Sequence, residues 1–89
     1  MSNNHKDHSY YNIIIKDMEK CAENEFLKNA RLLSININIE FFDESFNKHL
    51  LDVRTSIEKK SKDTLFLKTI LVENKNILIQ ATSIWSKQI

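Results

Sequence analysis

The chain has 89 residues and contains neither glycine nor proline. Tight turns in sheet proteins normally use both, because glycine tolerates a positive φ and proline presets φ. A chain that lacks them must turn with Asn, Asp, Ser and Lys. This suits a few long helices with short connections, so the sequence predicts an all-α fold.

Apolar residues at helical spacing predict three helices, at about residues 10–33, 42–60 and 64–88. Together they form a small three-helix domain over residues 9–89, preceded by a mobile tail at residues 1–8, which show no periodicity. Residues 61–64 either cap a hairpin between the second and third helices or let them merge into one rod. The sequence is consistent with both the hairpin and the rod.

Residues 34–41 break the helical pattern, because apolar and polar side chains alternate there as in a half-buried strand. Three outcomes compete. The stretch is an extended Ile/Asn connection, a helix imposed by packing, or a strand paired with its own copy across a dimer axis. The extended connection is favoured, because a lone strand has no partner within an all-α chain.

The predicted third helix carries more apolar surface than one helix leaves in water, so a partner is expected to cover it. Trp85 suits an interface anchor, and Asn74 either fixes register by pairing with another Asn or lies at the edge of the apolar face. The predicted protein-binding residues are Phe42, Phe46, Phe66, Ile70, Asn74, Ile77, Ile84 and Trp85.

No motif indicates an enzyme. Glycine-rich phosphate loops are impossible without glycine, and no paired-cysteine metal pattern occurs. Cys21 with His49 is a conceivable nucleophile and base, but a buried structural cysteine is the commoner case. His5 and His8 lack further ligands at metal-binding spacing. We expect no enzymatic activity, cofactor or metal.

Charge and cysteine content limit the remaining functions. The net charge of +1 argues against a dedicated nucleic-acid-binding protein. The single cysteine precludes an internal disulfide and fits a reducing compartment. No apolar run approaches the length of a membrane span, and the N-terminus lacks the apolar core of a signal peptide. A cytoplasmic location is expected.

The sequence thus predicts a non-enzymatic protein-binding helical module that acts through an apolar C-terminal helix as a homodimer or heterocomplex. Small adaptors, secretion chaperones, immunity proteins and anti-regulators all use such surfaces, and no small-molecule substrate is expected. The alternative is a small dimeric regulatory protein that binds nucleic acid through a basic cluster of Lys59, Lys60, Lys62 and Lys68.

Overall fold

The protein is mainly antiparallel sheet with one helix, so the all-α prediction is wrong. A computed structural model describes the backbone of residues 3–40 and 51–88, and the side chains of these residues from Tyr10 onward. The elements in chain order are α1 (Asn3–Phe26), β1 (Ala30–Ile39), β2 (Leu51–Lys60), β3 (Thr64–Glu73) and β4 (Asn76–Lys87).

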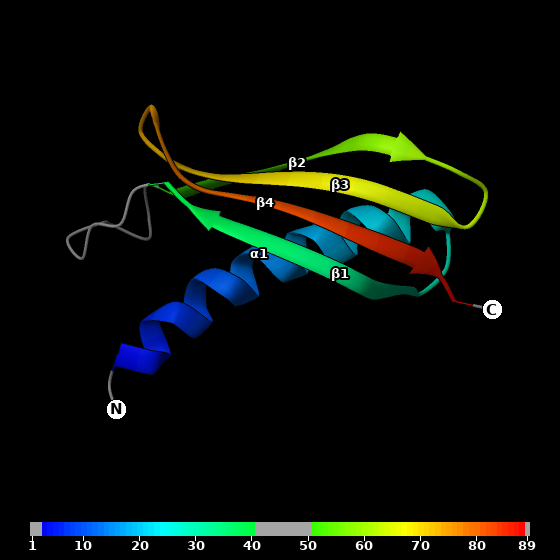
Figure 1. The fold of residues 1–89 in the computed structure, drawn as a ribbon, viewed down its shortest axis with the longest axis horizontal. Coiled ribbons are helices and arrows are strands. Elements are labelled where there is room, and N and C mark those ends of the chain that lie inside the picture. Colours follow the sequence, from blue (N-terminus) through cyan, green and yellow to red (C-terminus); the bar gives the residue numbers. More distant parts are fainter. Residues whose placement is uncertain (1–2, 41–50, 89) are drawn as a thin grey trace.

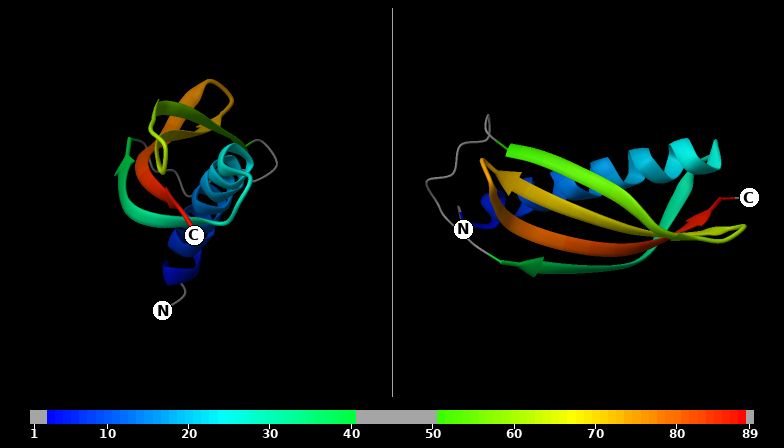
Figure 2. Two further views of the ribbon diagram at one scale, coloured as in Figure 1. Left: turned by 90° about the vertical axis from the view of Figure 1, so that its right-hand side faces the viewer. Right: turned by 90° about the horizontal axis from the view of Figure 1, so that it is seen from above.

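The four strands form one sheet in the order β1-β4-β3-β2, and every neighbouring pair is antiparallel. The β3–β4 hairpin therefore lies at the centre, and β1 and β2 lie at opposite edges although they follow each other in the chain. The sheet is twisted and curves around α1, which crosses one face of it (Figures 1 and 2). We call the face toward α1 the inner face and the opposite face the outer face.

Of the three predicted helices, α1 is the one that the described part of the chain contains. It begins at Asn3 and ends at Phe26, instead of covering residues 10–33. Its buried side chains recur every four residues and face the sheet. They are Tyr10, Ile14, Met18, Ala22 and Phe26. The helix ends where Leu27 adopts a positive φ of 56°, a conformation that usually requires glycine at a helix C-terminus.

The predicted third helix, residues 64–88, is instead the β3–β4 hairpin. Side chains at every second position point to the inner face and are buried, as the period of a strand requires. On β3 they are Leu65, Leu67, Thr69 and Leu71, and on β4 they are Ile79, Ala81, Ser83 and Trp85. Because the outer positions of the same strands are also partly apolar, the dense apolar sequence matched helical spacing by coincidence.

The other two predicted segments are also corrected. Residues 34–39 are extended, but they belong to β1 and pair with β4 of the same chain rather than forming a free connection. The described part of the predicted second helix, residues 51–60, is strand β2 and pairs with β3. β-Branched residues in both segments favour strands, because their side chains pack well on a pleated surface.

The turns show how a sheet forms without glycine. A two-residue loop, Asn74–Lys75, joins β3 to β4, and Asn74 takes a positive φ of 57°. Asparagine tolerates this region better than most residues, so it replaces glycine there. The turn between β2 and β3 is closed by the Ser61 amide, which donates to the Thr64 carbonyl at 2.8 Å. A hairpin corner or a continuous rod was expected at residues 61–64, whereas Asn74 was expected inside the third helix.

A chain of hydrogen bonds ties α1 to the sheet beside the apolar core. The Thr55 hydroxyl donates to the Asp17 carboxylate at 2.6 Å, and it lies 2.7 Å from the hydroxyl of Thr69. Since Thr55 has a single hydroxyl hydrogen, Thr69 must donate to Thr55. The fully buried Thr69 is thereby satisfied, and Asp17 is anchored to β2.

We predict that Leu67→Ala lowers the free energy of unfolding by about 2–5 kcal/mol, because it removes a side chain that is 1% exposed and leaves a cavity beneath α1. The matched control is Leu27→Ala, which truncates a leucine that is 88% exposed and should cost under about 0.5 kcal/mol. Urea denaturation followed by circular dichroism measures both. Equal losses would contradict the assignment of the inner face.

Candidate protein-binding surface

The outer face of the sheet carries apolar side chains along its two central strands. Phe66 pairs with Ile84 and Val72 pairs with Ile77 across the β3–β4 hairpin. Phe66 is 37% exposed and Ile77 is 41% exposed, although both lie in the middle strands of the sheet. We call this set the outer apolar row. Its members are Phe66, Ile70, Val72, Ile77 and Ile84. Val72 is 7% exposed, and the paired residues Lys68 and Thr82 separate Phe66 and Ile84 from the other three.

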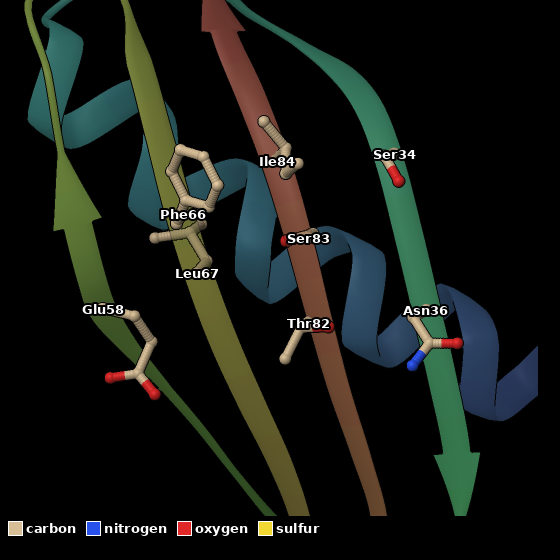
Figure 3. A pocket seen from close by; sticks show the side chains of 8 residues that line it. All are labelled: Ser34, Asn36, Glu58, Phe66, Leu67, Thr82, Ser83 and Ile84. Atoms are coloured by element: carbon tan, nitrogen blue, oxygen red, sulfur yellow. The ribbon is translucent and has the colours of Figure 1, made fainter.

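A shallow depression of about 230 Å³ lies on one end of this row. Phe66 and Ile84 form its apolar centre, and α1 lies behind the sheet in this view (Figure 3). Polar side chains from the flanking strands surround the centre, including Asn36 on β1 and Glu58 on β2. The Nζ atom of Lys59 lies 5.9 Å from the centroid of the Phe66 ring, where a cation is attracted by the aromatic face.

A second depression of about 370 Å³ lies farther along the same strands. Ile70 and Ile77 supply its apolar lining, and Arg54, Lys68 and Gln80 border it. The two depressions share Glu58, so they are parts of one continuous surface. The outer face is therefore an open surface with two apolar patches, which Lys68 and Thr82 separate and polar residues flank.

Four of the predicted protein-binding residues gather on this face, namely Phe66, Ile70, Ile77 and Ile84. They do so because of strand pairing and not because they share a helical stripe. Trp85 lies on the inner face instead, is 1% exposed, and donates from Nε1 to the Ser83 hydroxyl at 2.8 Å.

The other predicted contact residues lie elsewhere. Asn74 lies in the hairpin turn, so the interpretation that places it on an apolar helical face no longer applies. Phe42 and Phe46 lie outside the described residues. The partners of the outer row in the flanking strands, Ser34 and Asn36 among them, were not predicted, because their positions depend on the pairing of β1 with β4.

The two edges of the sheet differ strongly in charge. On β2, half of the ten residues are charged. They are Asp52, Arg54, Glu58, Lys59 and Lys60. On β1, which also has ten residues, Arg31 is the single charged residue. Charged side chains on an edge strand discourage pairing with another chain, so β2 is protected in this way and β1 is not.

The lysines of the predicted basic cluster are divided among different surroundings. Lys60 forms an ion pair with Glu25 on α1, and Lys59 contacts the Phe66 ring. Lys68 lies on the outer face between Phe66 and Ile70, whereas Lys62 lies in the turn before β3. A single basic surface of all four lysines is therefore absent from this arrangement.

Cys21 lies in a polar groove of about 310 Å³ between α1 and β2, which Asp17, Glu25 and Thr55 also line. Burial raises the pKa of its thiol above the ordinary value of 9.0, and the carboxylates of Asp17 and Glu25 raise the pKa further. A nucleophilic cysteine needs the opposite shift. His49, its conceivable base, lies outside the described residues.

Among the described residues, no three His, Cys, Asp or Glu side chains come close enough together to hold a metal ion. The described helix is not long and apolar enough to cross a membrane.

We predict that iodoacetamide alkylates Cys21 slowly at neutral pH, and that the rate in the folded protein rises with an inflection above pH 9.0. The same chain unfolded in urea serves as the control and should show a lower inflection. Because the folded state keeps the thiol proton to a higher pH, stability should also fall as the pH rises past 9.0. An inflection below that of the unfolded chain would contradict the role of burial.

Comparison with known proteins supports the fold and gives no function. No model of a known family matches the chain, and no curated protein is similar to it. Among solved structures, the chain resembles the crystal structure of a hypothetical protein (AQ1494) from Aquifex aeolicus, with a TM-score of 0.64 and 15% sequence identity. The match covers 92% of this chain and 80% of that one. The arrangement of one helix on a four-stranded sheet therefore has a counterpart among experimental structures.

Proposed function

We propose that the chain is a non-enzymatic protein-binding module that receives an extended polypeptide segment on the outer face of its sheet. The outer apolar row is the observation that carries the proposal. An antiparallel sheet with one packed face usually presents polar side chains to water on the other. Here, the outer face places Phe66 beside Ile84 at one end and the exposed Ile77 beside the buried Val72 at the other. Exposed apolar patches with a polar surround are typical of interaction sites.

The shape of the outer face favours a polypeptide over a small molecule. Small-molecule sites enclose most of their ligand, whereas both depressions on this face are shallow and open. Strands of ten residues extend for about 33 Å, which gives room for several side chains of an extended segment. The Asn36 side chain on β1 and the side-chain carbonyl of Gln80 on β4 offer hydrogen bonds to a peptide backbone, while the Gln80 amide nitrogen donates to the Glu40 carboxylate at 3.0 Å.

The binding mode differs from the one predicted from the sequence. Residues 64–88 form strands β3 and β4, so the prediction that a C-terminal helix binds the partner is wrong. In the present proposal, the exposed face of the sheet binds the partner. Adaptors, secretion chaperones, immunity proteins and anti-regulators all fit a module of this kind. The absence of enzymatic activity and the cytoplasmic location stay predictions.

We predict that Phe66→Ser combined with Ile77→Ser weakens binding of an extended polypeptide about tenfold or more, because each serine removes apolar area from the contact. The probe is a reduced and carboxymethylated protein, which stays unfolded, carrying a fluorophore. Fluorescence anisotropy measures its Kd with each variant.

Ile57→Ser provides the matched control, because Ile57 is 40% exposed, close to the 41% of Ile77, but points to the inner face at the β2 edge. It should leave the Kd unchanged. The proposal fails if the probe does not bind the parent chain, or if the control weakens binding as much as the outer-face variants. The same titration with duplex DNA at rising salt tests the nucleic-acid alternative, which requires binding that weakens steeply.

A further inference from the structure

We propose that β1 pairs antiparallel with β1 of a second copy of the chain, so that two four-stranded sheets become one continuous sheet. This inference uses the edge of the sheet and does not depend on the proposed function of its outer face. It rests on the charge of the strand, the direction of its free backbone groups, and the register that its side chains favour.

The β1 edge has the properties of a pairing edge. It is ten residues long, and its stretch from Leu32 to Ile39 has no charged residue. In the described part of the chain, no strand lies on the side of β1 away from β4. Leu33 and Ile39 leave 53% and 59% of their surface exposed. A long, uncharged edge strand with exposed apolar side chains is a template for another strand.

The backbone of β1 presents its free groups in a regular pattern. The Glu40 amide donates to the Leu78 carbonyl at 2.8 Å, in the register that also pairs Asn38 with Gln80. Residues of an antiparallel ladder alternate between groups that bond to the neighbour and groups that point away. The amides and carbonyls of Ile35, Ile37 and Ile39 therefore point to the free edge.

A bulge interrupts this pattern near the start of β1. The register with β4 shifts between Leu32 and Ser34, which leaves Leu33 without a paired residue on β4. The regular run of free groups therefore begins at Ile35. Three alternate residues, Ile35, Ile37 and Ile39, can thus bond to a strand beyond the edge.

One register places this run in a symmetric pair. With the two-fold axis at Asn36, Leu33 lies opposite Ile39 of the second copy, and Ile35 lies opposite Ile37 of the second copy. The Ile35–Ile37 pair occurs twice and gives two hydrogen-bonded pairs with about four inter-chain hydrogen bonds. This register also places the two most exposed apolar residues of the strand against each other at both ends.

Charge at the ends of the strand favours a second copy over an unrelated strand. Arg31 lies near the start of β1, and Glu40 directly follows its end. Antiparallel pairing brings the Arg31 end of one copy to the Glu40 end of the other, so opposite charges approach at both ends. The β1 sequence is therefore complementary to itself in the antiparallel direction.

The pairing also determines on which side of the joined sheet the helix of each copy lies. A two-fold axis perpendicular to the sheet keeps both α1 helices on one side. The outer faces then lie together on the other side, with the polar residues Ser34, Asn36 and Asn38 of both copies between the two outer apolar rows. The expected product is an eight-stranded sheet with helices on a single face.

Mass measurement tests the dimer, and paired charges test its register. Size-exclusion chromatography with light scattering should give twice the chain mass of 10.5 kDa at high micromolar concentration. Leu33→Lys with Ile39→Lys places like charges opposite each other at both ends. Leu33→Lys with Ile39→Glu places opposite charges there. The dissociation constant of the first variant should exceed that of the second about tenfold or more.

A cysteine at the axis gives a second measurement that does not depend on the stability of the charged variants. In a Cys21→Ser background, Asn36→Cys should form a covalent dimer under mild oxidation. Non-hydrogen-bonded antiparallel pairs separate Cα atoms by about 4.5 Å, which is within the disulfide range. Ser56→Cys, an exposed position on β2, is the control and should not cross-link.

A monomeric mass for the parent chain at high concentration would overturn the proposal. So would a dimer that cross-links through position 56 and not through position 36. Equal dissociation constants for the two charged variants would overturn the assigned register. If the Lys/Lys variant loses its circular dichroism signal, cross-linking at position 36 against position 56 tests the proposed pairing instead.

Discussion

The structure depends on the packing of one row of α1 side chains against one face of the sheet. Ile14, Met18 and Ala22 are fully buried there, and Trp85 covers them from β4 with its indole N–H satisfied by Ser83. No second helix covers the sheet within the described residues. The burial of apolar area in this single layer supplies the main stabilisation, while the Thr69–Thr55–Asp17 hydrogen bonds attach the helix at a defined place.

Because one helix covers one face, only the inner face of the sheet is packed in the core. The inner face needs large apolar residues for stability, and Leu65, Leu67 and Leu71 supply them on β3. The outer face has no such need, yet Phe66 and Ile70 alternate with these residues along the same strand. The edges differ in the same way, since β2 carries charges that prevent pairing and β1 does not. Apolar side chains that do not pack against α1 are therefore concentrated on the outer face and on the β1 edge.

Part of this structure could be predicted from the sequence. The helical spacing of apolar residues from Tyr11 to Phe26 correctly predicts a helix, and Ile14, Met18 and Ala22 of that stripe face the core. The alternation of residues 34–39 shows extended structure, and a paired strand was one of the open interpretations. Its partner in the same chain was not foreseen, because β4 had been assigned to a helix.

The central hairpin could not be recognised, because both faces of β3 and β4 contain apolar residues. With Leu, Ile and Val at most positions, a period of two and a period of 3.6 both match, and length alone favoured a helix. The absence of glycine does not exclude a sheet here, since only Leu27 and Asn74 adopt a positive φ in the described residues. Phe66, Ile77 and Ile84 were predicted as contact residues because they would share a face of a helix. Their positions on one face of the sheet come from strand register, which no local sequence pattern reveals.

The central claim is that the outer face, and not the inner one, is available to a polypeptide partner. Isoleucine methyl NMR tests it directly, because Ile70, Ile77 and Ile84 report on the outer face, while Ile14 and Ile79 report on the core. On addition of an unfolded polypeptide, the claim predicts methyl shift changes at the three outer residues and unchanged signals from the two core residues. Shifts confined to core methyl groups, or spread equally over both sets, would contradict it.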